Sequence, residues 1–440
     1  LTCETVPSIS AKVYAADWHE REVEDLFGLT FEGHPRLGDF VLHDDAWQEG
    51  LNPMRKGFDA YAPLEHRQPD VNWRPRQIVY EEGAFLMPIG PIHSAATAPV
   101  HFLLETAGED VIRAKPRLFY AYRGLEKIAE GRSAPDVLLI AERLSGTSAF
   151  AHSLAVCRAV ETICGIQVPD RAQTLRVFLA ELERFRDHVA AIHGICESTA
   201  LTVAASQVAI LEEDLLRLSG ALTGHRYLFG LNVFGGLSID FDDAVLRKTV
   251  ADAREVLKRL TDLQRMLSVS SSFLDRLEEC GFVSASDATV FGMVGPTARA
   301  SGVSRDLRKA HPYSGYEKFS FDVPYESEGD GYARLRLLFR EAEQSVNLMV
   351  RACDAMPGGA VRVPEARYKA GAALGWVEAP RGAALHWVRL RDEGVIERYR
   401  IITPSFANWH GFRLAAEEFA FQDFPIILAT FAVSVPENDR

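Results

Sequence analysis

Helical hydrophobic periodicity constrains the fold of this chain more than any other feature of its sequence. In residues 171–192, apolar side chains recur at steps of three and four, which places them along one face of an α-helix. These residues are Leu175, Phe178, Leu179, Leu182, Phe185, Val189 and Ile192. Asp170 stands where an N-cap residue is expected. The pattern predicts a long helix with one face packed in a core.

The same periodicity recurs in residues 137–163, 201–222, 244–274 and 334–353. Because an amphipathic helix must bury its apolar face against another element, these stretches predict a bundle of long helices. The predicted strands are shorter, at residues 77–80, 85–89, 100–106, 385–390 and 395–402, the last two flanking an Asp-Glu-Gly turn. We therefore predict an α+β fold, with a core of long helices and small antiparallel sheets.

Composition divides the chain into two parts. Residues 1–62 are dense in turns and charges, and residues 63–76 form a polar, proline-bearing stretch typical of a linker. Residues 77–440 hold all the long helical patterns. The sequence predicts a small N-terminal module, a linker and a large second domain.

Charge and cysteine usage exclude several functions. The formal net charge is -13, and no block of Lys and Arg could follow a phosphate backbone, so nucleic acid is not an expected partner. The six cysteines form no Cys-x-x-Cys pair, which argues against an iron-sulfur cluster or zinc held by this chain and for a reducing compartment. No apolar run approaches the roughly 20 residues that cross a bilayer, so we expect a cytoplasmic chain that reaches the membrane only through partners.

Three polar segments lie where a plain helical bundle would not need them. They are GPIH at 90–93, SGTS at 145–148 and GPTARASGVSRDLR at 295–308. Arg143 precedes the second segment and His152 follows it, while Arg299 lies in the third. Each has a purely structural explanation: Ser145 as a helix N-cap, His93 and His152 as hydrogen-bonded core histidines, and the arginines as ion pairs between helices. The spacing alone leaves both explanations open.

Ordered strings of residues carry a family resemblance. From residue 89 to residue 440 the chain resembles the large subunit of membrane-bound (group 4) nickel-iron hydrogenases and the homologous 49-kDa quinone-site subunit of respiratory complex I. The matching strings are IGPIH (89–93), YRGLEK (122–127), ERLSGTSAFAHS (142–153), GPTARASGVSRDLR (295–308), FDVPYESEGDGYAR (321–334), EAPRG (378–382) and TPSFANW (403–409). The resemblance implies a fold like that of the nickel-iron hydrogenase large subunit.

The N-terminal part resembles a second subunit of the same complexes. DWHEREVEDLFG (17–28), FEGHP (31–35) and PMRKGF (53–58) are similar to the closing portion of the complex I 30-kDa subunit, which is fused ahead of the large subunit in formate hydrogenlyases. In that family a folded α/β portion precedes this tail. The sequence leaves open whether that portion is a separate subunit.

The four nickel-binding cysteines of the hydrogenases have no counterpart here. The resemblance places the first pair on Ser145 and Ser148, and the second pair on Ser434 and Glu437 ahead of Asp439-Arg440. Soft metals are held by deprotonated sulfur, and a serine hydroxyl stays protonated near neutral pH, so we expect no nickel-iron centre. An oxygen-ligated magnesium or manganese site built from Glu437, His152 and the serines is a further hypothesis.

The quinone contacts of complex I are also incomplete. The resemblance places its second histidine on Thr97 and its quinone-binding tyrosine on Gly146, whereas His93, His152 and Arg299 remain. Two hypotheses follow. In one, a cavity lined by His93, Arg143, Ser145, Ser148, Arg299, Ser434 and Glu437 binds quinone or couples redox change to a membrane partner. In the other, the chain does no chemistry and docks a small iron-sulfur subunit.

The remaining expectations concern proton transfer and assembly. Glu126 and His152 are the candidate proton carriers, because a buried carboxylate or imidazole can be tuned towards neutral pKa. The resemblance implies a peripheral subunit on the inner face of the membrane, joined to a small iron-sulfur subunit and to membrane-arm subunits. It implies iron-sulfur clusters in the partners and no cofactor in this chain other than a quinone. Whether the chain is itself an enzyme stays open.

Overall fold

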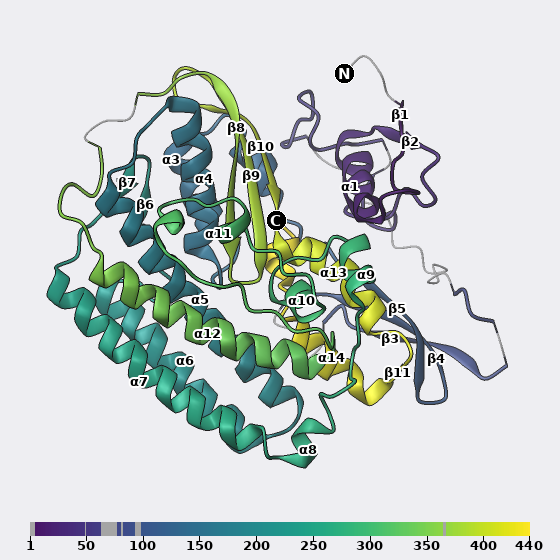
Figure 1. The fold of residues 1–440 in the computed structure, drawn as a ribbon. Helices are drawn as coiled ribbons and strands as arrows, with labels where there is room; N and C mark the ends of the chain where they lie inside the picture. The colour runs from purple at the N-terminus through teal and green to yellow at the C-terminus, as the bar shows by residue number, and fades with distance from the viewer. Residues whose placement is uncertain (1–4, 49, 63–76, 81, 93–97, 364–366) are drawn as a thin grey trace.

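A computed structural model describes residues 5–48, 50–62, 77–80, 82–92, 98–363 and 367–440. Its core is a bundle of four long helices: α5 (Asp170–Ser198), α6 (Thr202–Thr223), α7 (Asp243–Leu267) and α12 (Gly331–Asp354). Helix α5 packs against both α6 and α12, and α7 packs against α6 and α12 (Figure 1). The predicted α+β fold with a long-helix core is therefore confirmed.

Helix α5 departs from the prediction of one buried face. It is buried on nearly all sides, and its buried residues include Arg176, Glu181, Arg184 and His188. A buried charge is tolerated only when it is paired and hydrogen-bonded. The polar side of this helix therefore faces other parts of the chain rather than solvent.

Two predicted helices are interrupted, and one predicted cap is wrong. The 137–163 stretch forms α3 (Ala134–Glu142) and α4 (Ala149–Cys164), with the 145–148 segment as the turn between them. The 244–274 stretch ends at Leu267 and resumes as α8 (Ser271–Leu274). Pro169, not Asp170, is the N-cap residue of α5, and the Asp170 carboxylate accepts a hydrogen bond from Lys318 Nζ at 3.0 Å.

A three-stranded antiparallel sheet covers α4. Its strands are β8 (Gly371–Ala379), β9 (Gly382–Leu390) and β10 (Ile396–Ile402), in the order β10-β9-β8. The predicted hairpin corresponds to β9 and β10, whereas β8 was not predicted. Strand β8 runs so close to α4 that a Cβ added at Gly375 would overlap the Ala155 carbonyl oxygen.

A second sheet consists of β3 (Ala84–Ile89), β4 (His101–Ala107), β5 (Asp110–Arg117) and β11 (Phe419–Ala420), in the order β11-β5-β4-β3. It matches the strands predicted at 85–89 and 100–106. Residues 77–80 are not a strand. Instead, the backbone N–H groups of Ile78 and Val79 donate to the Glu105 carboxylate.

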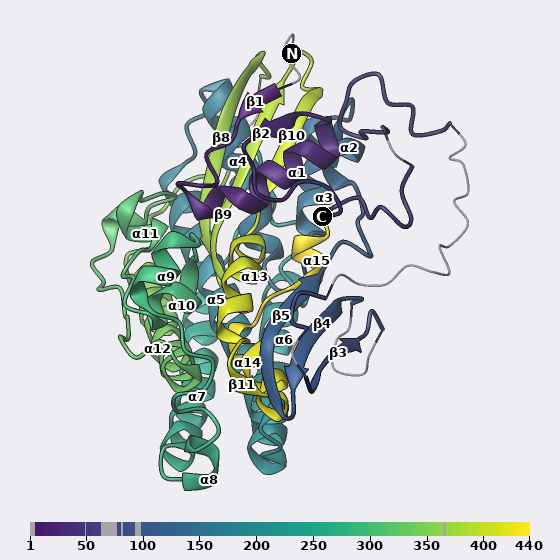
Figure 2. The ribbon, with the colours of Figure 1, turned by 90° about the vertical axis from the view of Figure 1, so that its right-hand side faces the viewer.

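The N-terminal segment lies beside β10, α2 and the C-terminal residues (Figure 2). It contains a parallel pair, β1 (Thr5–Pro7) and β2 (Thr30–Glu32), and helix α1 (Asp17–Phe27). Trp18 of α1 stacks on His410 at a ring distance of 5.1 Å, and Arg398 of β10 donates to the Met54 carbonyl. These contacts join the segment to the larger part of the chain.

The remaining elements are short, except for α13. They are η1 (Tyr14–Ala16), α2 (Leu125–Ala129), β6 (Asn232–Val233), β7 (Gly236–Leu237), α9 (Ala285–Val290), α10 (Gly295–Ala300), α11 (Leu307–Ala310), η2 (Tyr316–Lys318), α13 (Pro404–Ala415), η3 (Phe421–Asp423), α14 (Phe424–Phe431) and α15 (Val435–Asn438). Across the described ranges, no helix combines the length and the apolar character that a bilayer crossing needs.

The contact between β8 and α4 predicts a large effect of a single methyl group. Gly375→Ala brings a Cβ against the α4 backbone, which cannot give way, so we expect a loss of about 3 kcal/mol in the free energy of unfolding. Urea denaturation followed by circular dichroism measures it. Gly358→Ala is the matched control, since open space surrounds that exposed glycine. Equal stabilities of the two variants would contradict this packing.

Candidate functional site

Three helix starts converge on one buried carboxylate. Ser148 precedes α4, Ser405 lies in the first turn of α13, and Ser434 caps α15, where its hydroxyl accepts from the Glu437 N–H at 3.2 Å. Serine favours such positions because its hydroxyl can satisfy a free backbone group. Here the hydroxyls of Ser148 and Ser405 turn instead towards Glu437. We call Ser148, His152, Ser405, Ser434 and Glu437 the Glu437 cluster.

Glu437 is completely buried and bonded through both carboxylate oxygens. Ser148 Oγ donates to Oε1 at 2.6 Å, His152 Nε2 lies 3.2 Å from the same oxygen, and Ser405 Oγ donates to Oε2. Burial by itself would raise the pKa of Glu437. The hydrogen bond and charge of His152, together with Arg381 and Ser148, outweigh burial and hold the pKa at about 2. The carboxylate is therefore ionised at neutral pH.

A line of hydrogen bonds leads from this carboxylate into the β-sheet. His152 Nδ1 lies 2.9 Å from His386 Nε2 on β9, and His386 Nδ1 lies 2.6 Å from Tyr399 Oη on β10. An ionised Glu437 requires a proton on His152 Nε2. When His152 carries only this one proton, His386 Nε2–H donates to His152 Nδ1, and Tyr399 O–H donates to His386 Nδ1.

If His152 gained a second proton at Nδ1, it would donate to His386 Nε2, and His386 Nδ1–H would in turn donate to Tyr399 Oη. Burial lowers the pKa of His386 and raises that of Tyr399, so these two groups stay neutral and can relay a proton without retaining it. The arrangement can therefore hold a negative charge at one end and pass a proton along three side chains.

Helix α5 fixes the turn that carries Ser145 and Ser148. The Glu183 carboxylate accepts from the N–H groups of Phe150 and Ala151 at 2.8 and 2.9 Å, at the N-terminus of α4. Arg186 donates to the carbonyls of Gly146 and Thr147. Burial raises the pKa of Glu183 to about 8, against the lowering effect of Arg186 and these two backbone hydrogen bonds. Both residues escaped the sequence prediction.

The donor set does not fit a nickel-iron centre. Ser145 Oγ is bonded to Thr147 Oγ1 at 2.7 Å, and the hydroxyls of Ser148 and Ser434 are engaged with Glu437. Hydroxyls and a carboxylate are hard ligands, whereas nickel in this family needs thiolates. The hypothesis of a magnesium or manganese site gains no support, because the described residues include no group of three His, Cys, Asp or Glu placed to hold a metal.

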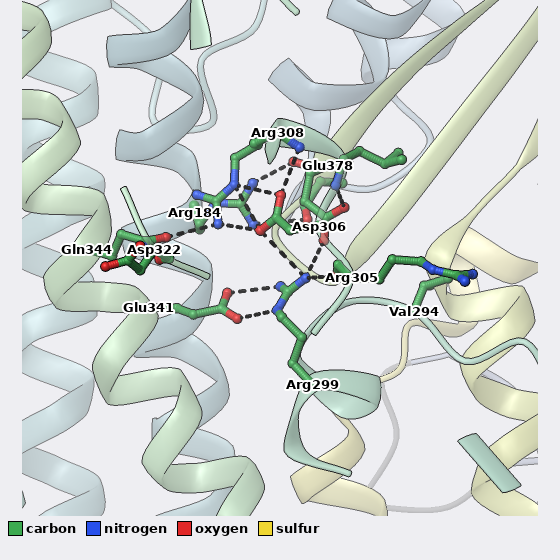
Figure 3. A network of polar contacts seen from close by, with 12 residues as sticks. Arg184, Val294, Arg299, Arg305, Asp306, Arg308, Asp322, Glu341, Gln344 and Glu378 are labelled. Carbon is green, nitrogen blue, oxygen red and sulfur yellow. Dashed lines mark hydrogen bonds and ion pairs between the residues drawn. The ribbon is translucent and has the colours of Figure 1, made fainter. Parts of the chain in front are cut away.

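The structure places the other predicted residues apart from the Glu437 cluster. Arg143 is largely exposed, donates to the Leu139 carbonyl and lies over the Phe229 ring. Arg299 of α10 is fully buried between Glu341 and Glu378 (Figure 3). His93 lies outside the described residues.

Glu126 belongs to a third set of contacts. Its carboxylate accepts from the Ile401 N–H at 2.7 Å and pairs with Arg400 and Arg440. The same two arginines pair with Glu22 of α1. Two carboxylates and two guanidiniums thus form a buried junction between the N-terminal segment, β10 and the C-terminus.

The sequence contained a usable signal for two of the missed residues. His386 and Tyr399 lie in the predicted hairpin, where alternate residues share a face. In the observed register His386 is opposite Ile401 and Tyr399 is opposite Val388, so the two are diagonal neighbours on the buried face. No local pattern indicates Glu183 or Ser405, because their partners are distant in sequence.

Comparisons with known proteins agree with this architecture. The family model described as "Respiratory-chain NADH dehydrogenase, 49 Kd subunit" matches residues 200–373 and 363–440, more than half of the chain. The chain belongs to this family. Two further models match other parts of the chain: "Respiratory-chain NADH dehydrogenase, 30 Kd subunit" over residues 2–63 and "Nickel-dependent hydrogenase" over residues 123–195.

The individual relatives of this 49-Kd-family chain include subunits of hydrogenase complexes and of NADH-quinone oxidoreductase. Formate hydrogenlyase subunit 5 of Escherichia coli is 34% identical, with 99% of this chain and 77% of the relative covered. Hydrogenase-4 component G of the same organism is 32% identical, covering 99% and 76%. The C/D subunit of NADH-quinone oxidoreductase from Bdellovibrio bacteriovorus is 34% identical, covering 78% and 62%. The predicted family, with its fused 30-kDa-like part, is confirmed.

The low pKa of Glu437 predicts a pH-dependent stability. A pKa of about 2 in the folded state, against 4.5 ordinarily, contributes on the order of 3 kcal/mol above pH 4.5, which is lost as pH falls towards 2. Glu437→Gln cannot titrate, so the stability difference from the unmodified protein should shrink across that range. Urea titrations from pH 6 to pH 3 measure it. Exposed Glu343→Gln should show no such trend; a constant difference for Glu437→Gln would exclude the paired carboxylate.

The junction at Arg440 predicts a selective loosening of the N-terminal segment. Arg440→Ala leaves Glu22 and Glu126 short of one buried cation, and we expect a loss of about 3 to 5 kcal/mol in the free energy of unfolding. Limited proteolysis should cut residues 5–62 sooner in this variant. Lys56→Ala removes a half-exposed partner of Glu130 and serves as the control, with a change below about 1 kcal/mol.

Proposed function

We propose that this chain is the large peripheral-arm subunit of an oxidoreductase complex related to respiratory complex I and to energy-converting hydrogenases, and that it works without a nickel-iron centre. The observation that carries the proposal is the Glu437 cluster, which places hydroxyls and one ionised carboxylate where the sequence resemblance puts the metal thiolates of the hydrogenases. Family membership supports the assignment to such a complex.

The organisation of the complex follows from the same comparison. We infer that residues 1–62 act as a 30-kDa-like module, that residues 63–76 link it to residues 77–440, and that a small iron-sulfur subunit docks on the large domain. Membrane-arm subunits would attach the complex to the inner face of the membrane. The names of the relatives support this, because they are subunits of hydrogenases and of NADH-quinone oxidoreductase. The iron-sulfur clusters then belong to the partners.

Within such a complex, we assign this chain to redox coupling through proton transfer. The line from Glu437 through His152 and His386 to Tyr399 supports this role, because each link is within hydrogen-bond distance and fully buried. A quinone is the candidate oxidant or reductant nearby. Arg299 offers no free guanidinium to such a quinone, since Glu341 and Glu378 already pair with it.

A purely structural role is the second candidate. It is favoured by one specific observation: every oxygen of the Glu437 carboxylate already has a partner within the chain. In this role the cluster only replaces the packing that a metal centre would supply, and the chain serves to dock the iron-sulfur subunit.

Activity of the reconstituted complex separates the two roles. With the neighbouring iron-sulfur and membrane subunits present, His152→Gln should lower quinone reduction about 100-fold if His152 relays protons, while the complex stays assembled. His193→Gln, at a partly exposed histidine of α5, is the matched control. Undiminished turnover of His152→Gln in an intact complex would favour the structural role.

Elemental analysis tests the absence of the bimetallic centre. We expect less than roughly one nickel per ten purified chains, because no thiolate stands at the four ligand positions. Stoichiometric nickel and iron, or hydrogen uptake by the purified chain, would overturn the proposed function.

A further inference from the structure

Eight ionisable side chains, none of them in the Glu437 cluster, meet where α5 and α12 face α10, α11 and β8. We call them the Arg299 cluster: Glu181, Arg184 and His188 of α5, Arg299 of α10, Asp306 and Arg308 around the start of α11, Glu341 of α12 and Glu378 of β8. None is more than 3% exposed. Figure 3 shows Arg299 between Glu341 on one side and Asp306 and Glu378 on the other.

Arg299 connects the two halves of this cluster. Its Nε donates to Glu341 at 2.7 Å, while Nη1 donates to Glu378 at 2.7 Å and to the Arg305 carbonyl at 3.0 Å. His188 Nε2 lies 3.0 Å from the other oxygen of Glu341. Glu378 also accepts from the Leu307 N–H at 3.0 Å. His188 and Glu378 are therefore linked through Glu341 and Arg299.

The other half consists of paired charges. Arg308 binds Asp306 at 2.7 Å and Glu181 at 3.0 Å, and Arg184 lies 3.4 Å from Glu181. Tyr316 donates to Glu181, and Arg308 also donates to Gln344. Tyr313 faces the backbone of Glu378. These neighbours are uncharged.

The charges do not balance. Four carboxylates face three guanidiniums, so the cluster carries one excess negative charge when all carboxylates are ionised and His188 is neutral. An uncompensated buried charge is costly, and a group usually changes its protonation instead. The nearby charges do not remove the excess. Asp187 is paired with Arg381. Burial lowers the pKa of Arg334, against the smaller raising effect of the negative charge of Asp330, and the hydrogen bonds of Arg334 go to carbonyls and to Thr430.

We propose that the Arg299 cluster is a proton-binding site that holds one exchangeable proton, seated either on Glu378 or on His188. With the proton on His188, the four pairs His188–Glu341, Arg299–Glu378, Arg308–Asp306 and Arg184–Glu181 are each neutral. With the proton on Glu378, Arg299 pairs with Glu341 instead. In both arrangements the cluster has no net charge, and the proton can move between Glu378 and His188 while Arg299 stays in place.

The surroundings favour Glu378 as the group that normally carries the proton. Burial and the charge of Asp306 raise the pKa of Glu378, against the lowering effect of Arg299 and Arg184. His188 shares a small cavity of about 20 Å³ with Asp187, Arg334 and Arg381. That cavity is large enough for about one water molecule, which would give the proton a route to His188.

The binding of this proton is a property of the chain alone, whereas its use in coupling rests on the proposed function. A site whose proton can shift between two seats responds to charge changes nearby, such as those that accompany electron transfer. In this respect the Arg299 cluster would store a proton, while the line from Glu437 to Tyr399 would conduct one.

Two spectroscopic measurements on the purified chain at pH 7 test the proposal. Infrared difference spectra between the unmodified protein and Glu378→Gln report a protonated carboxyl group at Glu378. Nitrogen NMR of histidine-labelled protein, with His188→Gln for assignment, reports whether His188 is an imidazolium. We expect the carboxylic-acid band of Glu378 together with a neutral His188. Glu183→Gln removes a different buried carboxyl and leaves this band in place.

One protonated group of the two supports the site, whichever of them carries the proton. Neither group protonated, or both protonated, would overturn it. If Glu378→Gln does not fold, Glu378→Asp keeps the carboxyl and should shift the band rather than remove it. In the reconstituted complex, unchanged turnover of Glu378→Gln would leave the proton site standing and would count against the coupling role alone.

Discussion

The structure depends on the nearly complete burial of α5, a helix rich in charged residues. Each charge that cannot reach water must find a partner from another element, because an unpaired buried ion would cost several kcal/mol. Arg176 forms a two-point contact with Glu161 of α4, and Arg184 donates to the carbonyls of Glu378 and Ala379 at the end of β8. The helix therefore orients the segments around it as well as packing against them.

The same requirement positions both buried polar sites. Glu183 and Arg186 hold the 145–148 turn, which presents Ser148 to Glu437. One and two positions further along, Asp187 pairs with Arg381, and His188 reaches Glu341 in the Arg299 cluster. A helix that is buried on all sides can serve two sites at once, because its side chains point in every direction around the axis.

Ser145, Ser148, Ser434 and Glu437, which the resemblance sets at the thiolate positions of the hydrogenases, all have hydrogen-bond partners within this chain. A carboxylate at Glu437 accepts from two serine hydroxyls and faces a histidine, so the positions that would bind a soft metal now form a hard, anionic cluster. Oxygen and imidazole groups handle protons where sulfur would hold nickel. The relationship to hydrogenases and to complex I subunits is thus seen in the fold, while the Glu437 cluster presents hydroxyls, an imidazole and a carboxylate rather than thiols.

The sequence by itself determined the long helices, the hairpin predicted at residues 385–390 and 395–402, the family, and the lack of cysteine at the expected ligand positions. Periodicity, turn residues and residue identities are local features that can be read directly from the sequence. It also placed Ser148, His152, Ser434 and Glu437 on one candidate site, although only through the resemblance. The interruption of the 137–163 helix was missed, because apolar periodicity continues on both sides of the turn that Arg186 holds from another helix.

Only the tertiary structure decided how the charges pair. Contacts between residues far apart in the chain decide three features. They are the close packing of β8 on α4 at Gly375, the hydrogen bonds of Glu183 to the start of α4, and the four carboxylates and three guanidiniums around Arg299. Charged residues on a helix look alike in sequence whether they face water or other ions. Burial distinguishes the two cases, and burial is a property of the packed molecule.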